Sequence, residues 1–360
     1  MQRILSVVTG QVYHYGLKPL MFRQDPEVVH NRMVAMGKKI TSWAPVAALM
    51  KALWAYQTPQ TLKKIDGIVF PNPVGLAAGF DYDGDLLTST PAIGFGFHTI
   101  GTVTLRPYSG NPAPRLTRLP DSQSIIVNKG LKSSGAAAII AKLSQQVMHI
   151  PTGISIASTN RKYESESEQI LEITDCFRLF EESSLKHSYY ELNISCPNTF
   201  GGEPFTTPKR LEKLMNRMDA LKLSRPLYVK MPIDQDNADT LQLLKVLDRH
   251  SVQGVVFGNL TKDKTNPDVK PADVATWKSL PGNLSGRPTF KRSNQRIKLC
   301  RAAFGSRFTI IGTGGIFSGA EAAEKMRLGA DLVQLITGMI YEGPQLIGQI
   351  NQYLATRKLE

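Results

Sequence analysis

The sequence predicts an α/β fold, a (β/α)8 (TIM) barrel with an N-terminal helical extension. From about residue 65, short β-branched or aromatic runs alternate with longer segments of helical character. Eight such units fit into roughly 300 residues, which suits this barrel. The competing open, doubly wound sheet is disfavoured, because no Gly-x-Gly-x-x-Gly motif follows the first predicted strand and the best phosphate-site motif lies near the end of the chain.

We divide the chain into a helical region at residues 1–60 and a barrel at residues 61–360. Residues 25–27 (Asp-Pro-Glu) predict a helix start, with an N-cap, a proline at the first helical position and an acid in the first turn. This helix is expected to end near Gly37 or Lys38, and a second helical run covers residues 43–56. The two helices either cap a core or form an interfacial pair on a membrane, as their tryptophans and nearby lysines would suit.

The barrel strands are expected to be apolar and nearly uninterrupted, as in a parallel sheet covered on both faces. The eight predicted strands are residues 74–80, 96–104, 153–157, 189–195, 226–231, 254–259, 308–315 and 332–337. The clearest helices between the later strands are residues 209–222, 236–250, 290–303 and 319–328.

Composition limits the function classes. Hydrophobic residues make up 42% of the 360 residues and charged residues only 20%, so the chain is globular rather than disordered. The net charge of +13 suits a polyanion, an anionic lipid surface or a charged small molecule. Three cysteines cannot make a disulfide framework, and the N-terminus lacks the pattern of a secretory signal. No run of 18 apolar residues predicts a membrane span, and no metal-ligand spacing predicts a metal site.

Polar residues follow several predicted strands, and in such a barrel they meet at one mouth. Thr102, Asn193, Lys230 and Asn259 lie at strand ends, and Cys196 lies just after one. Singly, each has an ordinary structural explanation, since asparagine is common in turns and a buried cysteine is usually a small hydrophobe. A buried lysine, however, requires a partner, which an anion or a cofactor would provide.

The loops after the last two strands predict a phosphate site. One contains Gly314 and Gly315, and the other begins at Thr337. Together with Lys230 and the asparagines, this arrangement points to flavin mononucleotide (FMN), with the lysine stabilising negative charge on the reduced ring. Cys196 is then a candidate acid or base, provided that its pKa is lowered.

Amide side chains point to the substrate class. Asparagine offers paired donors and acceptors, which match an imide or cyclic amide better than a sugar or an aliphatic acid. The asparagines expected at the mouth are Asn128, Asn193, Asn198 and Asn259.

The chain resembles the dihydroorotate dehydrogenase family, specifically its membrane-associated, quinone-using class, over nearly its whole length. The resemblance implies an FMN-binding barrel with an N-terminal helical pair on the membrane. The motifs that carry it are residues 22–30 (Phe-Arg-Gln-Asp-Pro-Glu…His), 72–81, 94–104, 110–116, 284–288 and 341–344.

The resemblance also implies roles for individual residues. FMN contacts would fall on Ala78, Gly79, Thr102, Ser155, Asn193, Lys230, Gly286, Gly314, Gly315 and Thr337. The substrate would meet Asn128, Asn193, Asn198 and Asn259. We also expect Tyr82 and Lys129 at the substrate, although the family pattern does not carry these two residues over. The base would be Cys196, and a quinone tunnel would involve His30 and Arg118. The implied reaction oxidises (S)-dihydroorotate to orotate and then reoxidises FMNH2 with a quinone, in pyrimidine synthesis.

Several positions depart from the family pattern. Cysteine stands at 196, where the quinone class normally has serine, and Tyr82 replaces a lysine that serves both substrate and flavin. The loop beginning at Asn128 is one residue short, and Lys129 or Lys132 is a candidate to supply the missing charge. Leu260 replaces a threonine, and Ile336 replaces a tyrosine near the flavin phosphate.

These departures keep other hypotheses open. The protein could act on another dihydropyrimidine or cyclic amide, or be a catalytically silent flavin-binding relative. A tRNA dihydrouridine synthase-like activity ranks low, since no basic stripe with interleaved aromatics predicts a nucleic-acid partner. We expect peripheral attachment to the cytoplasmic face of a membrane.

Overall fold

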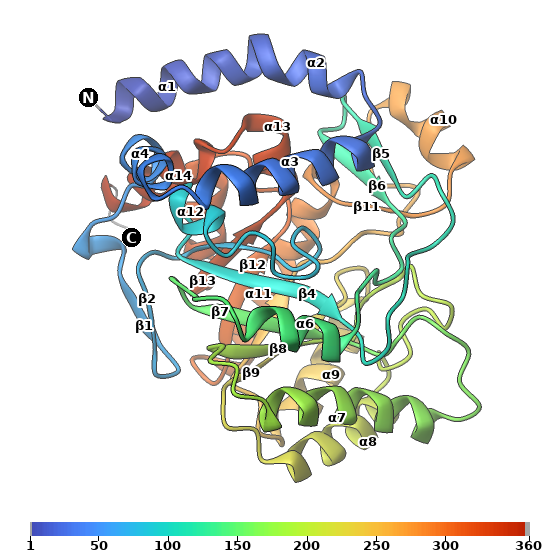
Figure 1. Cartoon of the computed structure of the whole chain (residues 1–360). Helices are drawn as coiled ribbons and strands as arrows, with labels where there is room; N and C mark the ends of the chain where they lie inside the picture. Colours follow the sequence, from blue (N-terminus) through green and yellow to red (C-terminus); the bar gives the residue numbers. More distant parts are fainter. Residues whose placement is uncertain (1, 357–360) are drawn as a thin grey trace.

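The computed structural model describes residues 2–356 and contains a closed barrel of eight parallel strands (Figure 1). Each barrel strand pairs with the next one along the chain, and the last pairs with the first. The predicted (β/α)8 fold is confirmed, and every predicted strand overlaps an observed one. The barrel strands are β3 (Val74–Leu76), β4 (Phe97–Val103), β7 (Thr152–Ile156), β8 (Tyr189–Asn193), β9 (Leu227–Met231), β10 (Gly254–Phe257), β12 (Thr309–Thr313) and β13 (Leu332–Leu335).

Helices surround this barrel. α8 shows why they form: Pro208 opens it, and Leu211, Leu214, Met215 and Met218 recur at helical spacing on its buried face. The four helices predicted between the later strands are present, whereas α6 and α7 were not predicted. The surrounding helices are α5 (Ser89–Ala92), α6 (Ala136–Leu143), α7 (Glu166–Glu182), α8 (Pro208–Leu221), α9 (Asn237–Asp248), α11 (Phe290–Phe304), α12 (Gly319–Arg327), α13 (Thr337–Glu342) and α14 (Leu346–Thr356).

Strand register sets the floor of the barrel mouth. Asn193 on β8 lies level with Lys230 on β9, and Glu191, two residues earlier on β8, lies level with Ser155 on β7. Because neighbouring parallel strands hold these residues side by side, their side chains can form one polar layer inside the barrel.

Short elements outside the barrel were not predicted. A hairpin places Phe70 against Phe97, with ring centroids 5.3 Å apart, in a buried cluster with side chains of the barrel strands. A second, three-stranded sheet contributes to the wall of the mouth. The hairpin is β1 (Lys63–Ile65) and β2 (Ile68–Phe70); the small sheet is β5 (Leu116–Leu119), β6 (Ser124–Val127) and β11 (Asn283–Leu284); the remaining short helices are α10 (Pro271–Ser279), η2 (Pro59–Thr61) and η3 (Arg287–Thr289).

The N-terminal region contains more helix than predicted. Asp25 caps α3 as expected, accepting hydrogen bonds from the amides of Glu27 (2.8 Å) and Val28 (2.9 Å). α3 continues to Thr41, past the predicted end. A rod formed by α1, a π-helical turn and α2 lies above α3 in Figure 1 and was not predicted. These elements are α1 (Gln2–Val12), η1 (Tyr13–Leu17), α2 (Lys18–Phe22), α3 (Pro26–Thr41) and α4 (Ala44–Trp54).

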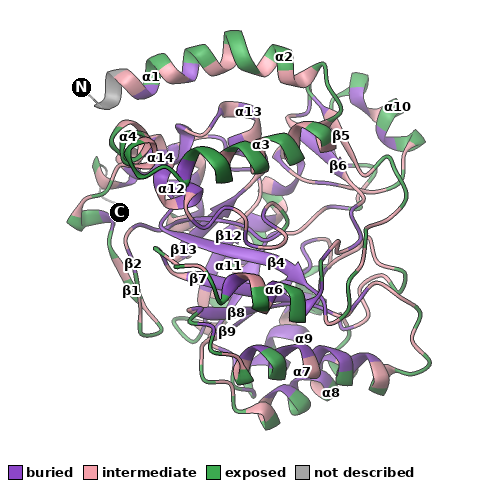
Figure 2. Cartoon of the chain, in the orientation of Figure 1, coloured by how far each residue is buried: buried purple, intermediate pink, exposed green. Residues whose placement is uncertain are grey.

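Exposed positions are frequent along α1, α2 and α3 (Figure 2). Large apolar side chains are among the exposed ones in the N-terminal region, including Val12 on α1, Tyr15 on η1, Leu20 on α2 and Trp43 just before α4. Within residues 2–356, no helix combines the length and apolar character needed to cross a membrane.

Candidate active site

Two adjoining cavities lie at the mouth of the barrel, where the carboxyl ends of the strands meet. The inner cavity, of about 100 Å³, is bounded by the loops after β12 and β13. The outer cavity, of about 160 Å³, extends toward α3 and the small sheet. They share the walls formed by Ala78, Lys230, Asn259, Leu260, Ser285, Ile336 and Thr337. A single elongated ligand could therefore occupy both.

The inner cavity has a glycine cradle that suits a phosphate. Gly314 and Gly315 have φ values of 97° and 70°, which glycine adopts without strain. A Cβ on Gly315 would lie 2.4 Å from the Cβ of Phe290, so only glycine fits there. The amides of Gly314, Gly315 and Thr337 donate no hydrogen bond to the described chain and remain available to an anion. Gly286 completes the wall, and its Cβ would lie 2.4 Å from the carbonyl oxygen of Gln123.

Lys230 lies where the two cavities join. Its side chain is almost fully buried, and no hydrogen bond joins its amine to the residues described. Its carboxylate neighbour is Glu191, at 3.8 Å. A buried ammonium group that faces a cavity without a close acceptor is suited to an anionic or carbonyl-rich cofactor. The cradle and this lysine together fit FMN.

A hydrogen-bonded network forms the floor beside Lys230. Asn193 Nδ2 donates to Thr102 Oγ1 (3.0 Å), which lies 3.0 Å from Ser155 Oγ. Ser155 in turn donates to Glu191 Oε1 at 2.9 Å. Thr102 and Asn193 line the outer cavity, whereas Ser155 is fully buried beneath it and does not line either one.

Cys196 lies in the outer cavity and is partly exposed. Burial raises the pKa of its thiol to about 11, although the amide of Asn198 and the charge of Lys230 act in the opposite direction. A thiol acts as a base at neutral pH most readily when its pKa is lowered, as we expected for Cys196. The structure shows the opposite shift, so the thiol is protonated at neutral pH and its thiolate is a minor but more basic form.

Three of the four predicted asparagines, Asn193, Asn198 and Asn259, line the outer cavity. Asn259 donates to the carbonyl oxygen of Ser195 and to its hydroxyl, both at 2.7 Å. Asn128 is not part of the cavity wall. Its Oδ1 accepts from Asn111 Nδ2 at 2.9 Å, and Asn111 was not identified from the sequence.

A charged cluster forms the end of the outer cavity near α3. Lys129 pairs with Glu27 at 2.5 Å, and its amine lies 5.4 Å from the ring centroid of Tyr82. His30 packs on the same tyrosine, with centroids 5.6 Å apart. Burial, with a smaller effect from Lys129, lowers the pKa of His30 to about 4, so this imidazole is neutral at pH 7. Burial also raises the pKa of Tyr82.

Arg118 does not line the cavity with His30. Its guanidinium donates to the carbonyl oxygen of Gln24 at 2.7 Å and covers the ring of Phe22, 4.6 Å from the centroid. The Arg118 side chain therefore contacts the N-terminal helical region instead of the cavity. Among the outer-cavity residues that the sequence analysis did not single out are the apolar Phe80, Leu116, Ile125, Val127 and Ile340.

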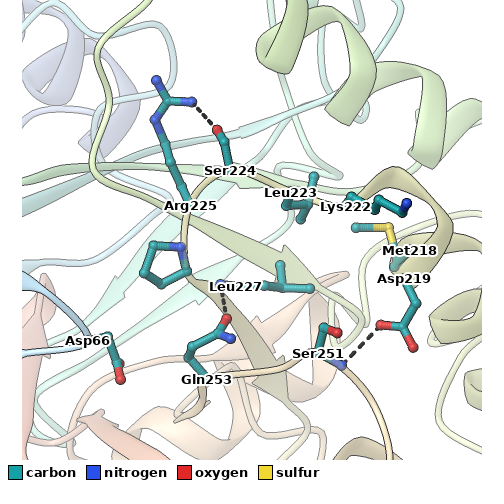
Figure 3. A pocket seen from close by; sticks show the side chains of 11 residues that line it. Asp66, Met218, Asp219, Lys222, Leu223, Ser224, Arg225, Leu227, Ser251 and Gln253 are labelled. Carbon is teal, nitrogen blue, oxygen red and sulfur yellow. Dashed lines mark hydrogen bonds between the residues drawn. The ribbon is translucent and has the colours of Figure 1, made fainter.

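A larger cavity of about 570 Å³ contains none of the predicted site residues (Figure 3). Asp219 accepts from the amide of Ser251 there at 3.0 Å, and Gln253 accepts from the amide of Leu227 at 2.8 Å. These polar groups are already paired with the protein. No group of three or more potential metal ligands (His, Cys, Asp or Glu) occurs in the described chain.

The chain is similar to known proteins in sequence and in structure. Residues 61–357 match the family model described as dihydroorotate dehydrogenase. The chain is 34% identical to the dihydroorotate dehydrogenase (quinone) of Synechococcus sp. (strain JA-2-3B'a(2-13)), over 96% of this chain and 93% of that protein. It is also 34% identical to the enzyme of that name from Methylococcus capsulatus, over 96% and 99%. A crystal structure of DHODH from Eimeria tenella in complex with ferulenol superposes with a TM-score of 0.80 at 25% identity, covering 95% and 93% of the two chains. The chain belongs to the dihydroorotate dehydrogenase family.

Proposed function

We propose that this protein oxidises (S)-dihydroorotate to orotate with FMN and delivers the electrons to a quinone, as a step of pyrimidine synthesis. FMN is the cofactor of this family, and the Synechococcus and Methylococcus relatives, which are of similar length, are quinone enzymes by name. The observation that carries the proposal is the continuous cavity, which joins an anion cradle, Lys230, Cys196 and three asparagines.

Residues of the inner cavity and of the junction between the two cavities would bind FMN. The cradle of Gly286, Gly314, Gly315 and Thr337 would hold the FMN phosphate, and Lys230 would lie at the ring. Ala78, Gly79 and Thr102 would complete the flavin wall. When bound, FMN accepts the hydride that leaves the substrate.

The other half of the oxidation is removal of a proton from the neighbouring substrate carbon. We assign this step to the thiolate form of Cys196, so that the C–H electron pair forms the new C=C bond and the proton ends on Sγ. Asn193, Asn198 and Asn259 would orient the ring by donating to its carbonyls and accepting from its N–H groups.

The substrate carboxylate requires a cation, and Tyr82 cannot provide one. Lys129 is the candidate, because it lines the cavity and its amine lies beside the Tyr82 ring. It is held by Glu27, so substrate binding would exchange one carboxylate for another at the same ammonium group.

The first test is anaerobic absorbance spectroscopy of the FMN-loaded protein with dihydroorotate, followed by a quinone. The flavin band should bleach and then return, and Cys196→Ala should bleach far more slowly with the same bound FMN. An unbleached band would reject this substrate. Tyr82 and Leu260 favour one second candidate, a neutral dihydropyrimidine or cyclic amide, which faster bleaching by dihydrouracil than by dihydroorotate would support.

We assign residues 1–60 to membrane and quinone docking and residues 61–360 to the FMN-binding barrel. His30 on α3 lines the outer cavity, so a quinone that enters beside this helix would reach the cavity that adjoins the proposed flavin site. Arg118 lies outside this cavity, against Phe22 at the end of α2. The extension exposes Tyr15 (85%) and Leu20 (60%), and exposed apolar side chains on a helical segment suit attachment to the cytoplasmic face of a membrane.

Liposome flotation tests this docking. The double variant Tyr15→Asp, Leu20→Asp should lose binding to anionic vesicles, while Val147→Asp, at a position that is 68% exposed outside the extension, should retain it. Equal flotation of the two variants would reject the docking face.

A further inference from the structure

Glu191 is a buried carboxylate that the proposed mechanism does not use. It lies on β8 inside the barrel and is 0% exposed. Its Oε1 accepts from Ser155 at 2.9 Å, but its Oε2 is buried without any hydrogen-bond partner in the described chain. Burying a carboxylate oxygen without a donor is unfavourable. Its presence therefore calls for a compensating interaction.

The compensating charge is Lys230, whose Nζ lies 3.8 Å from Glu191 Oε1. The same carboxylate anchors Ser155, which contacts Thr102, which in turn accepts from Asn193. Glu191 thus connects to three cavity residues from below without lining either cavity itself. Glu191 therefore lies beneath the proposed flavin site, in contact with residues that hold the cavity side chains in place.

We propose that Glu191 is a positioning residue that fixes Lys230 at the flavin site and partly offsets its positive charge. This inference rests on FMN binding as assigned above. A positive charge near the ring stabilises the reduced, negatively charged flavin, and a negative charge behind it weakens that effect. Glu191 therefore lowers the reduction potential of FMN and makes the reduced cofactor a better electron donor to the acceptor.

The test is the midpoint potential of bound FMN, measured by anaerobic titration against a reference dye without substrate or quinone. Glu191→Gln should raise the potential by at least the equivalent of a tenfold change in the reduction equilibrium, about 30 mV for a two-electron couple. Glu172→Gln is the matched control, because Glu172 is also buried without lining either cavity. It differs from Glu191 in its partners, which are Thr159, Arg161 and Tyr163 rather than Lys230 and Ser155. This control should leave the potential unchanged.

Glu191→Asp is a second variant, which keeps the proposal testable if Glu191→Gln does not fold or bind FMN. It keeps the charge but shortens the side chain by one methylene group, so a smaller shift in the same direction is expected. A wild-type potential in FMN-loaded Glu191→Gln would overturn the proposal, as would a wild-type potential in Glu191→Asp if the glutamine variant does not bind FMN. A wild-type protein that binds FMN but fails to oxidise dihydroorotate would refute the proposed substrate and leave this measurement intact.

Discussion

Flavin reduction by dihydroorotate should accelerate about tenfold per pH unit through the neutral range. The reason is the raised pKa of Cys196, about 11, which results mainly from burial. At pH 8 only about one thiol in 1,000 is ionised, and at pH 9 about one in 100. If the thiolate takes the substrate proton, the observed rate follows this fraction and continues to rise above pH 10.

Anaerobic stopped-flow absorbance measures this half-reaction directly, since the flavin band bleaches without any contribution from the quinone. Cys196→Ala should lose about 10²–10⁴-fold in rate, which is the usual contribution of a general base. Cys196→Ser should react more slowly than the wild type and also show no plateau, because a hydroxyl is less acidic than a thiol. Orotate affinity is the control for an intact pocket.

Two results would refute this reasoning. A plateau below pH 8 in the wild type would mean that the thiol pKa is lowered when the site is filled, with Lys230 outweighing burial. A slope that persists in Cys196→Ala would show that another group takes the proton.

Three further predictions concern charge at buried positions. Lys129→Met should weaken orotate binding about 10- to 150-fold by calorimetry, since a charged hydrogen bond contributes about 1.5–3 kcal/mol, whereas Glu27→Gln should not weaken it. Burial lowers the pKa of His187 to about 3, so stability is lost as pH falls below the unfolded value near 6.5. In urea unfolding, His187→Phe should therefore gain about 2 kcal/mol relative to wild type between pH 7 and pH 5, and no relative gain would contradict this account. Burial lowers the pKa of Lys325 to about 7, so the unfolded chain binds more protons and stability rises from pH 7 toward 10.5. Lys325→Met should lack about 2 kcal/mol of that rise between pH 7 and pH 9, and parallel pH profiles would show that the lysine is not buried in neutral form.

The barrel could be predicted because each of its strands has a local sequence pattern, a short apolar run between helical segments. The α1–α2 rod could not, since Gly10, Gln11 and His14 interrupt its apolar pattern. It is held instead by distant contacts. Tyr13 donates to the carbonyl oxygen of Ile340 at 2.6 Å, and His14 pairs with Glu342 at 2.8 Å. The two partners of each contact lie more than 300 residues apart in the sequence, so a local sequence pattern cannot reveal them.

The same distinction applies to the site. Lys230, Asn193 and Asn259 could be predicted because a parallel barrel brings strand ends together. Glu191 was missed because a single acid within an apolar strand does not reveal which face of the strand it occupies. Glu27 was read only as a helix-start residue, and its partner Lys129 lies 102 residues away.

The pairing of Glu27 with Lys129 also decides how membrane docking should be studied. Glu27 and His30 belong to the helical extension, yet one holds a cavity lysine and the other lines the cavity. Removing residues 1–60 would therefore strip a counter-ion and part of the wall from the substrate site together with the exposed apolar face. Loss of activity in such a truncation would say nothing about membranes. Substitutions at Tyr15 and Leu20 separate the two roles, because both side chains are exposed and neither lines the cavity. Loss of flotation with unchanged orotate affinity would establish that one face of the extension serves the membrane and the other the substrate.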